Sequence, residues 1–250
     1  MLAGISPLRI RRLLLVAAML CFPCAAIAME FNLIGNTLVL SGAVVDADLA
    51  KTKDVLNPSK VKLIVMHHNV GGDLWNAIRI GERIRDSGIP TTISGLCISA
   101  CGLIYLGGKT RTFSDGGDLD KMSVWLHGAI SRDGKRVVTT SGPTISHYLA
   151  TMTEGKYPDE LMEKTVYSKS PDNYITVSHP RQYTFIGPPG RKGISECLVS
   201  VKFNVANPES SDVRSKCSIQ KGHDAISIGV ITDTEITQLD QQVKDFLRSL

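Results

Sequence analysis

Asn-Val-Gly-Gly-Asp at residues 69–73, Cys-Ile-Ser-Ala-Cys at residues 97–101 and Trp-Leu-His-Gly at residues 125–128 are the stretches that decide the fold of this chain. Each follows or ends an apolar, strand-like run, so the glycine pair, the serine and the histidine are expected to meet at one edge of a sheet. A glycine pair lets the backbone pass close to a reacting carbonyl group and present N–H groups to it, as an oxyanion hole requires.

The residue types in these stretches predict nucleophilic catalysis. Ser99 is the candidate nucleophile and His127 the base that takes its proton. The N–H groups of Gly71, Gly72 and Ala100 are the candidate oxyanion donors, the last of them helped by a helix dipole. Structural roles compete with these: a tight turn for the glycines, an N-cap for the serine and a strand-end position for the histidine.

The N-terminus has the pattern of an export signal. Three arginines (Arg9, Arg11 and Arg12) precede an apolar run over residues 13–27, and Ala26-Ile27-Ala28 ends it. The run is about 15 residues long, short of the roughly 20 that cross a bilayer. We expect residues 1–28 to be removed and a periplasmic or secreted chain to begin at Met29.

The charge balance argues against a nucleic-acid or membrane surface. The chain has 28 basic and 24 acidic side chains, and loss of the three signal arginines leaves 25 against 24. Nucleic-acid and anionic-membrane surfaces need a clear basic excess. Residues 29–250 suffice for one domain of moderate size with a core.

Cysteine usage predicts disulfides. Two of the six cysteines lie in the signal, and four remain: Cys97, Cys101, Cys197 and Cys217. An even number in an exported protein favours bridges, with the first two clamping the Ser99 turn and the last two closing a polar loop. The crossed pairing and free thiols remain open.

Metal and cofactor sites are not expected. His67 and His68 are adjacent and are expected to point to opposite faces of a strand, and no histidine pair lies at zinc-ligand spacing near the cysteines.

Strand and helix patterns alternate along the chain, which predicts an α/β fold with a mainly parallel sheet and crossover helices. The expected strands cover residues 37–42, 61–66, 91–96, 110–113 and 122–127, and the expected helices cover 73–87, 99–106, 144–153 and 158–167. Residues 191–250 are expected to form a C-terminal extension with a cysteine loop. Its last segment begins with Thr232 and Glu235 at capping-box spacing and continues as an amphipathic helix through Ile236, Leu239, Val243 and Leu247.

From about Asn36 to Gly187 the chain resembles the ClpP/crotonase superfamily, most closely the exported ClpP-like periplasmic proteins. The resemblance is carried by His68-Asn69-Val70-Gly71-Gly72, by Gly95-Leu-Cys-Ile-Ser99-Ala, by Trp125-Leu126-His127-Gly128 and by Ser170-Pro171-Asp172-Asn173-Tyr174. It implies a ClpP-like α/β domain over residues 29–190 and Asp172 as the acid of a Ser-His-Asp triad. Val70 replaces the proline of the family's Ser-Pro-Gly-Gly turn. Asp115, Asp118 and Asp120 are alternative acids.

The resemblance implies an exported serine hydrolase, a peptidase that acts on peptides or unfolded protein without an ATPase partner; a homo-oligomer stays open. A serine-lysine dyad with Lys135 is a related alternative. Another is a catalytically silent fold that binds an extended peptide or a partner protein in the same groove. An acyl-CoA reaction ranks third, because exported proteins meet no CoA.

Overall fold

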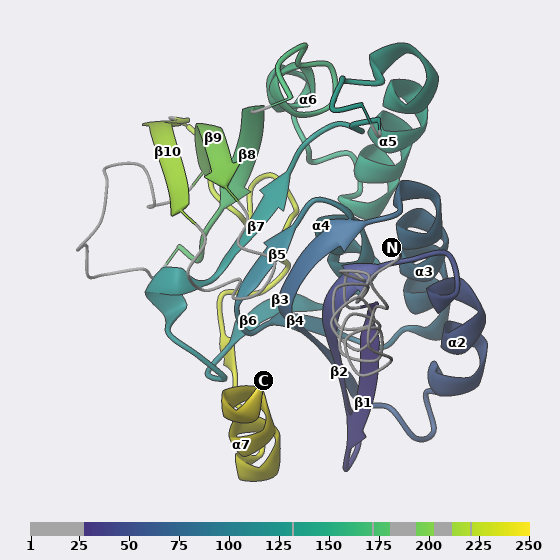
Figure 1. The fold of residues 1–250 in the computed structure, drawn as a ribbon. Coiled ribbons are helices and arrows are strands. Elements are labelled where there is room, and N and C mark those ends of the chain that lie inside the picture. The colour runs from purple at the N-terminus through teal and green to yellow at the C-terminus, as the bar shows by residue number, and fades with distance from the viewer. Residues whose placement is uncertain (1–27, 132, 172, 181–193, 203–211, 221) are drawn as a thin grey trace, which may run out of the picture.

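The computed structural model describes residues 28–131, 133–171, 173–180, 194–202, 212–220 and 222–250. Within them the chain forms one 11-stranded sheet (Figure 1), whose main path runs β10-β9-β8-β7-β5-β3-β4-β6-β11, while β2 and β1 add to the other edge of β3. The strands are β1 (Glu30–Ile34), β2 (Thr37–Val44), β3 (Leu63–Gly72), β4 (Thr91–Ile93), β5 (Leu96–Ile98), β6 (Arg111–Ser114), β7 (Ser123–Leu126), β8 (Asn173–Val177), β9 (Ile194–Lys202), β10 (Asp212–Ile219) and β11 (Ile236–Thr237).

The centre of the sheet is parallel and its flanks are antiparallel. Strand β3 pairs in parallel with β2, β4 and β5, and the pairs β4–β6, β5–β7 and β6–β11 are also parallel. Strands β1, β8, β9 and β10 join antiparallel. The predicted α/β class with a mainly parallel sheet is confirmed, and β9 and β10, expected in a separate extension, continue the same sheet.

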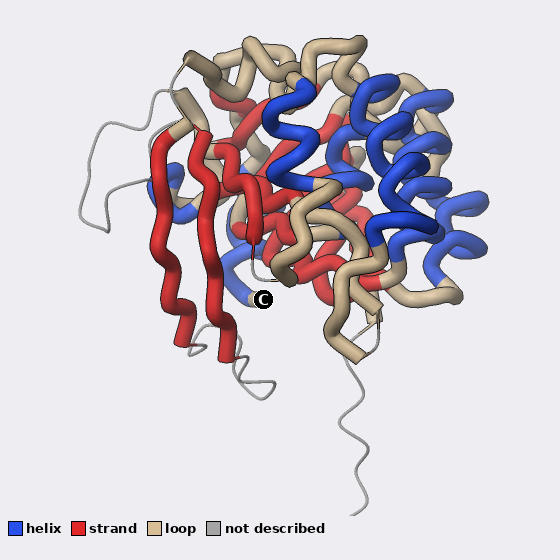
Figure 2. The backbone as a smooth tube through the Cα atoms, turned by 90° about the horizontal axis from the view of Figure 1, so that it is seen from above, coloured by secondary structure: helices blue, strands red, loops and turns tan. Residues whose placement is uncertain are grey.

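Helices cover the sheet mainly on one side, as the view from above shows (Figure 2). They are α2 (Asp48–Val55), α3 (Leu74–Ser87), α4 (Ala100–Leu106), α5 (Val138–Met152), α6 (Asp159–Thr165) and α7 (Gln241–Ser249), with one 3-10 turn at Leu119–Lys121. None of the helices in the described ranges has the length and apolar character that crossing a lipid bilayer demands.

Helix α3 follows the sequence rules closely. The Asp73 carboxylate caps it by accepting from the backbone N–H of Asn76 at 2.7 Å. Gly88 ends it in the left-handed region at φ 70°. Helix α4 is buried at every residue, as its uniformly apolar sequence predicts.

Helix α5 begins earlier than expected. Gly142-Pro143 indicates a break, yet the helix starts at Val138 and carries Pro143 inside it. A Cβ at Gly142 would lie 3.0 Å from the Tyr167 ring, so this turn packs tightly on the segment after α6. Packing has outweighed the local cost of a proline.

The C-terminal segment differs from its prediction. Thr232 does not cap a helix; its hydroxyl accepts from the backbone N–H of Arg111 at 2.8 Å, and Ile236 then pairs with β6. The amphipathic helix starts only at Gln241. Its apolar residues still share one face, because Leu239, Val243 and Leu247 pack on Val39 and Val65 on the opposite side of the sheet from the main core.

Candidate active site

Three strand ends converge where the sequence placed them. In the register of the sheet, Asn69 of β3 lies opposite Cys97 of β5, and Ile98 lies opposite Trp125 of β7. The Ser99 backbone N–H extends this ladder by donating to the Trp125 carbonyl at 2.8 Å. The glycine pair therefore ends β3, while Ser99 and His127 directly follow β5 and β7, and these three strands are adjacent and parallel.

Ser99 occupies a strained turn between β5 and α4. Its backbone has φ 59° and ψ −121°, a region that L residues with a side chain rarely adopt. Its side chain makes no capping hydrogen bond, so the N-cap role is not the one it plays. The residue is half-buried, and its hydroxyl has no hydrogen-bond partner within the described part of the chain.

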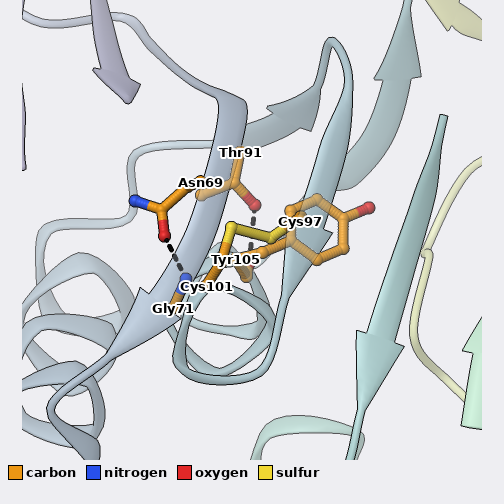
Figure 3. Close-up of a disulfide and its surroundings, with 6 residues drawn as sticks. All are labelled: Asn69, Gly71, Thr91, Cys97, Cys101 and Tyr105. Atoms are coloured by element: carbon orange, nitrogen blue, oxygen red, sulfur yellow. Dashed lines mark hydrogen bonds between the residues drawn. A yellow bond between two sulfur atoms is a disulfide. The ribbon is translucent and has the colours of Figure 1, made fainter. Parts of the chain in front are cut away.

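Gly71 lies directly against this turn. A Cβ at position 71 would approach the Ile98 carbonyl oxygen to 2.5 Å, the Ser99 Cβ to 2.8 Å and the Ala100 nitrogen to 2.9 Å, at a φ of 86°. No other residue type fits there. The Gly71 N–H donates to the Asn69 Oδ1 at 3.0 Å (Figure 3), so this amide is already occupied. The oxyanion roles of Gly72 and Ala100 stay predictions.

A disulfide brackets the serine. Cys97 and Cys101 are bonded, with an S–S distance of 1.99 Å, and both are fully buried (Figure 3). Of the alternatives left open by the sequence, the structure therefore has the pairing of Cys97 with Cys101, and not a crossed pairing or free thiols at these two positions. Cys197 and Cys217 lie directly opposite one another in the β9–β10 register. Their side chains lie outside the described part, so that bridge stays a prediction.

His127 lies in the turn after β7 but is not joined to the serine. Its Nδ1 is 2.6 Å from the Gly128 carbonyl oxygen and 3.0 Å from a terminal nitrogen of Arg136, and its ring packs edge-on against Tyr174 with centroids 4.5 Å apart. No hydrogen bond links the described side chains of Ser99 and His127. A carbonyl only accepts and a guanidinium only donates, so Nδ1 can make a hydrogen bond with one of these two groups and not with both. We assign the shorter contact, to Gly128, as the hydrogen bond, which puts the proton on Nδ1 and leaves the Nε2 lone pair for a proton acceptor role.

The surroundings of His127 oppose its protonation. Burial, followed by the adjacent Arg136 charge, lowers the pKa of the ring from 6.5 to about 4, against the smaller opposing effect of the Gly128 carbonyl. The ring is therefore neutral at neutral pH, and the positive charge that it would acquire as a base is disfavoured.

Arg136 is the residue of this site that the sequence reading missed. Residues 131–136 have the charged, glycine-containing composition of a solvated turn, and Lys135 is indeed exposed, forming a surface ion pair with Asp133 at 3.1 Å. Arg136 instead is half-buried, and its side chain contacts the His127 turn. The sequence signal is slight: Arg136 directly precedes the apolar pair Val137-Val138.

The predicted acid, Asp172, lies outside the described residues. Asp115, one of the alternative acids, contacts the C-terminal segment instead: it accepts from the Leu239 N–H at 2.9 Å and from Lys244 at 2.5 Å. Asp118 caps the 3-10 turn. Among the described carboxylates, none contacts His127.

The two adjacent histidines of β3 were predicted wrongly. Their rings are in edge contact with centroids 4.3 Å apart, because His68 takes φ 42° and breaks the strand alternation where the β2–β3 register shifts. His67 is buried and donates to the Ser94 carbonyl at 2.8 Å. Burial and the neighbouring His68 lower its pKa to about 4. The described residues contain no group of three metal-ligating side chains.

Comparison with known proteins gives structural matches only. No family model matches the chain, and no curated protein matches it. Among solved structures, a variant of ClpP1 from Listeria monocytogenes has a TM-score of 0.44 at 12% identity, covering 84% of this chain and 94% of that one. A variant of the 1510-N membrane-bound stomatin-specific protease has a TM-score of 0.41 at 15% identity, covering 54% and 71%. An enoyl-CoA hydratase/isomerase from Acinetobacter baumannii has a TM-score of 0.38 at 12% identity, covering 89% and 81%. All three are matches of structure at 15% sequence identity or less.

Proposed function

We propose that the chain is a serine hydrolase, acting on peptide bonds, with Ser99 as its nucleophile. The observation that carries this proposal is the Ser99 backbone, held at φ 59° between a strand and a helix with Gly71 packed against it. Such strain costs about 1–3 kcal/mol and concentrates at functional sites. A serine on a sharp strand-to-helix turn is also how α/β-hydrolases expose their nucleophile.

The reaction would proceed through an acyl-enzyme. The Ser99 Oγ attacks the peptide carbonyl while its proton passes to the His127 Nε2, and the carbonyl oxygen becomes an oxyanion held by the N–H groups of Gly72 and Ala100. The C–N bond breaks as the proton moves to the leaving amine. Water, deprotonated by the same ring, then releases the acid and restores the hydroxyl. Hydrogen bonds of this kind are often long in free enzymes and shorten when substrate binds.

An exported setting and an extended substrate complete the proposal. The Cys97–Cys101 bridge supports a periplasmic or secreted location, because disulfides persist in oxidising compartments. Beside the site, Trp125 packs with Leu96, Ile98 and Tyr174 in an apolar cluster separate from the main core. This surface suits the side chains of an unfolded peptide, a substrate that needs no ATP-driven unfolding partner.

A second candidate, a catalytically silent module that binds extended peptides, is favoured by Arg136. A triad acid would stabilise the imidazolium, whereas the guanidinium beside Nδ1 destabilises it. The same strand ends and apolar cluster would then bind peptide without cleaving it.

A fluorophosphonate probe separates the two candidates. We expect the wild-type chain and Ser94→Ala to be labelled, and Ser99→Ala not to be. Ser94 is a suitable control because it is a buried serine in the neighbouring turn whose hydroxyl has no partner among the described residues. Equal labelling of wild type and Ser99→Ala would overturn the nucleophile. A wild type that binds unfolded peptide but takes no label would establish the binding module.

A further inference from the structure

We propose that Arg136 is the positioning residue of His127: it holds the Gly128 carbonyl, which takes the place at Nδ1 that a carboxylate holds in a serine triad. The inference deepens the proposed hydrolase and rests on it for the reactive role of His127. It starts from contacts that do not depend on any reaction.

The guanidinium of Arg136 joins two separate turns through main-chain carbonyl groups. Its Nε donates to the Ser170 carbonyl at 2.8 Å, and a terminal nitrogen donates to the Asn173 carbonyl at 2.6 Å. The other terminal nitrogen donates to the Gly128 carbonyl and lies 3.0 Å from the His127 Nδ1. One side chain thereby ties the turn after β7 to the start of β8.

This arrangement needs the shape of arginine. A planar fork donates in several fixed directions at once, whereas a lysine ammonium is a compact charge on a flexible stem. Because Arg136 holds the Gly128 carbonyl, it also fixes the acceptor toward which the His127 Nδ1 points, and with it the ring's tautomer and orientation. A carboxylate would fix the same tautomer, but with the opposite charge.

Burial of the ring, with that charge added to it, gives the site a distinct pH range. The groups that face the described His127 ring are Arg136, the Gly128 carbonyl from its own turn and the Tyr174 ring from β8. Among the described residues that face the ring, Arg136 is the charged one. The ring therefore stays neutral into acidic solution and remains a proton acceptor there, at the cost of basic strength. A carboxylate-supported histidine would lose its acceptor role at a higher pH.

Proton NMR titration of the histidine rings tests the charge, on protein produced from the full-length sequence, with His127→Asn assigning the signal. The expected wild-type midpoint of His127 lies at least one pH unit below 6.5. Arg136→Gln should raise it toward 6.5 without reaching that value, because burial of the ring remains, and Arg136→Lys, which keeps the charge, should leave it low. Arg85→Gln is the matched control, because Arg85 also donates to two main-chain carbonyls, those of Leu106 and Met152, and should not move the midpoint.

The positioning role has its own readout. Arg136→Lys should reduce the rate of fluorophosphonate labelling at least tenfold although the midpoint stays low, because the fork is lost. A wild-type midpoint near 6.5, no rise in Arg136→Gln, or full labelling of Arg136→Lys would each overturn the proposal. If Arg136→Gln does not fold, the His127 midpoint of the wild type and the labelling rate of Arg136→Lys still test the proposal. The titration needs no turnover, so an unlabelled wild type with the expected midpoints would refute the hydrolase and leave the electrostatic role of Arg136 intact.

Discussion

The Ser99 turn and the His127 turn follow adjacent strands, yet they are held in different ways. The first is fixed by a covalent bond across it and by the backbone of Gly71 pressed against it. The second is held by the backbone of Gly128, which donates to the Thr165 carbonyl at 2.8 Å and lies close to Val166, and by one side chain, Arg136, that reaches back from a later turn. A covalent bond is therefore particular to the nucleophile side, and a side-chain charge is particular to the base side. A change on the first side should therefore act on folding, and a change on the second should act on proton transfer.

Gly71→Ala should have the largest effect. The added Cβ would meet three backbone or Cβ atoms at 2.5 to 2.9 Å, which cannot be relieved by a side-chain rotation. We expect a loss of about 4 kcal/mol or more in unfolding free energy, measured by urea titration, together with loss of labelling. Gly88→Ala is the control: it also has a positive φ, but nothing lies within 4 Å of its Cβ, so about 1 kcal/mol is expected. Equal losses would mean that close approach is unimportant at Gly71.

Removing the disulfide tests the covalent part of the same turn. The double substitution of Cys97 and Cys101 by alanine should cost about 2 to 3 kcal/mol, because the loop it closes is short. Labelling should slow more than stability alone explains, since Ser99 is then free to leave its strained conformation. The comparison is made well below the unfolding temperature, where both forms are folded. An unchanged labelling rate would show that Gly71 suffices to hold the serine.

Acid should weaken the fold through His67. Its pKa is lower in the folded state than in the unfolded chain, so the unfolded chain binds the proton more readily between pH 6.5 and 4. Stability is complete above pH 6.5 and is lost as the pH falls toward 4. Between pH 7 and pH 5 we expect about 2 kcal/mol of loss from this residue, and His67→Gln should remove that share of the pH dependence. The same pH dependence in the variant would place its origin elsewhere.

Asp172→Asn should have the smallest effect. The His127 Nδ1 is already engaged by the Gly128 carbonyl and lies beside Arg136, so a carboxylate is not needed to orient the ring. We expect labelling to slow by less than about tenfold, against about 100-fold or more for His127→Ala. A larger loss of labelling rate in Asp172→Asn than in Arg136→Lys would show that the Asp172 carboxylate is the third member of the triad.

The sequence predicted the nucleophile side well because local rules decide it. Capping by Asp73, the left-handed Gly88 and the uniformly apolar α4 are all properties of neighbouring residues. The requirement for glycine at position 71 also follows from a motif, although its contacts come from another strand.

The base side could not be predicted in this way. Arg136 looks like any charged residue of a surface turn, and only the return of the chain through Ser170 and Asn173 supplies carbonyls to which it donates. The contact between the His67 and His68 rings likewise depends on an irregularity in strand pairing that alternation does not reveal. Long-range acceptors and register shifts are the information that local patterns lack.

The pairing of β6 with β11 sets the order in which the fold can be completed. The buried Arg111 at the start of β6 donates from Nε to the Val230 carbonyl at 3.0 Å, across 119 residues, and β11 then pairs with the outer edge of that strand. While the chain is still being synthesised and its final residues are not yet available, β6 is therefore an open edge of the sheet. The Arg111 guanidinium then also lacks the Val230 carbonyl as an acceptor. Such edges recruit other strands, so a chain that stalls or is truncated before Val230 should aggregate rather than form a smaller stable domain.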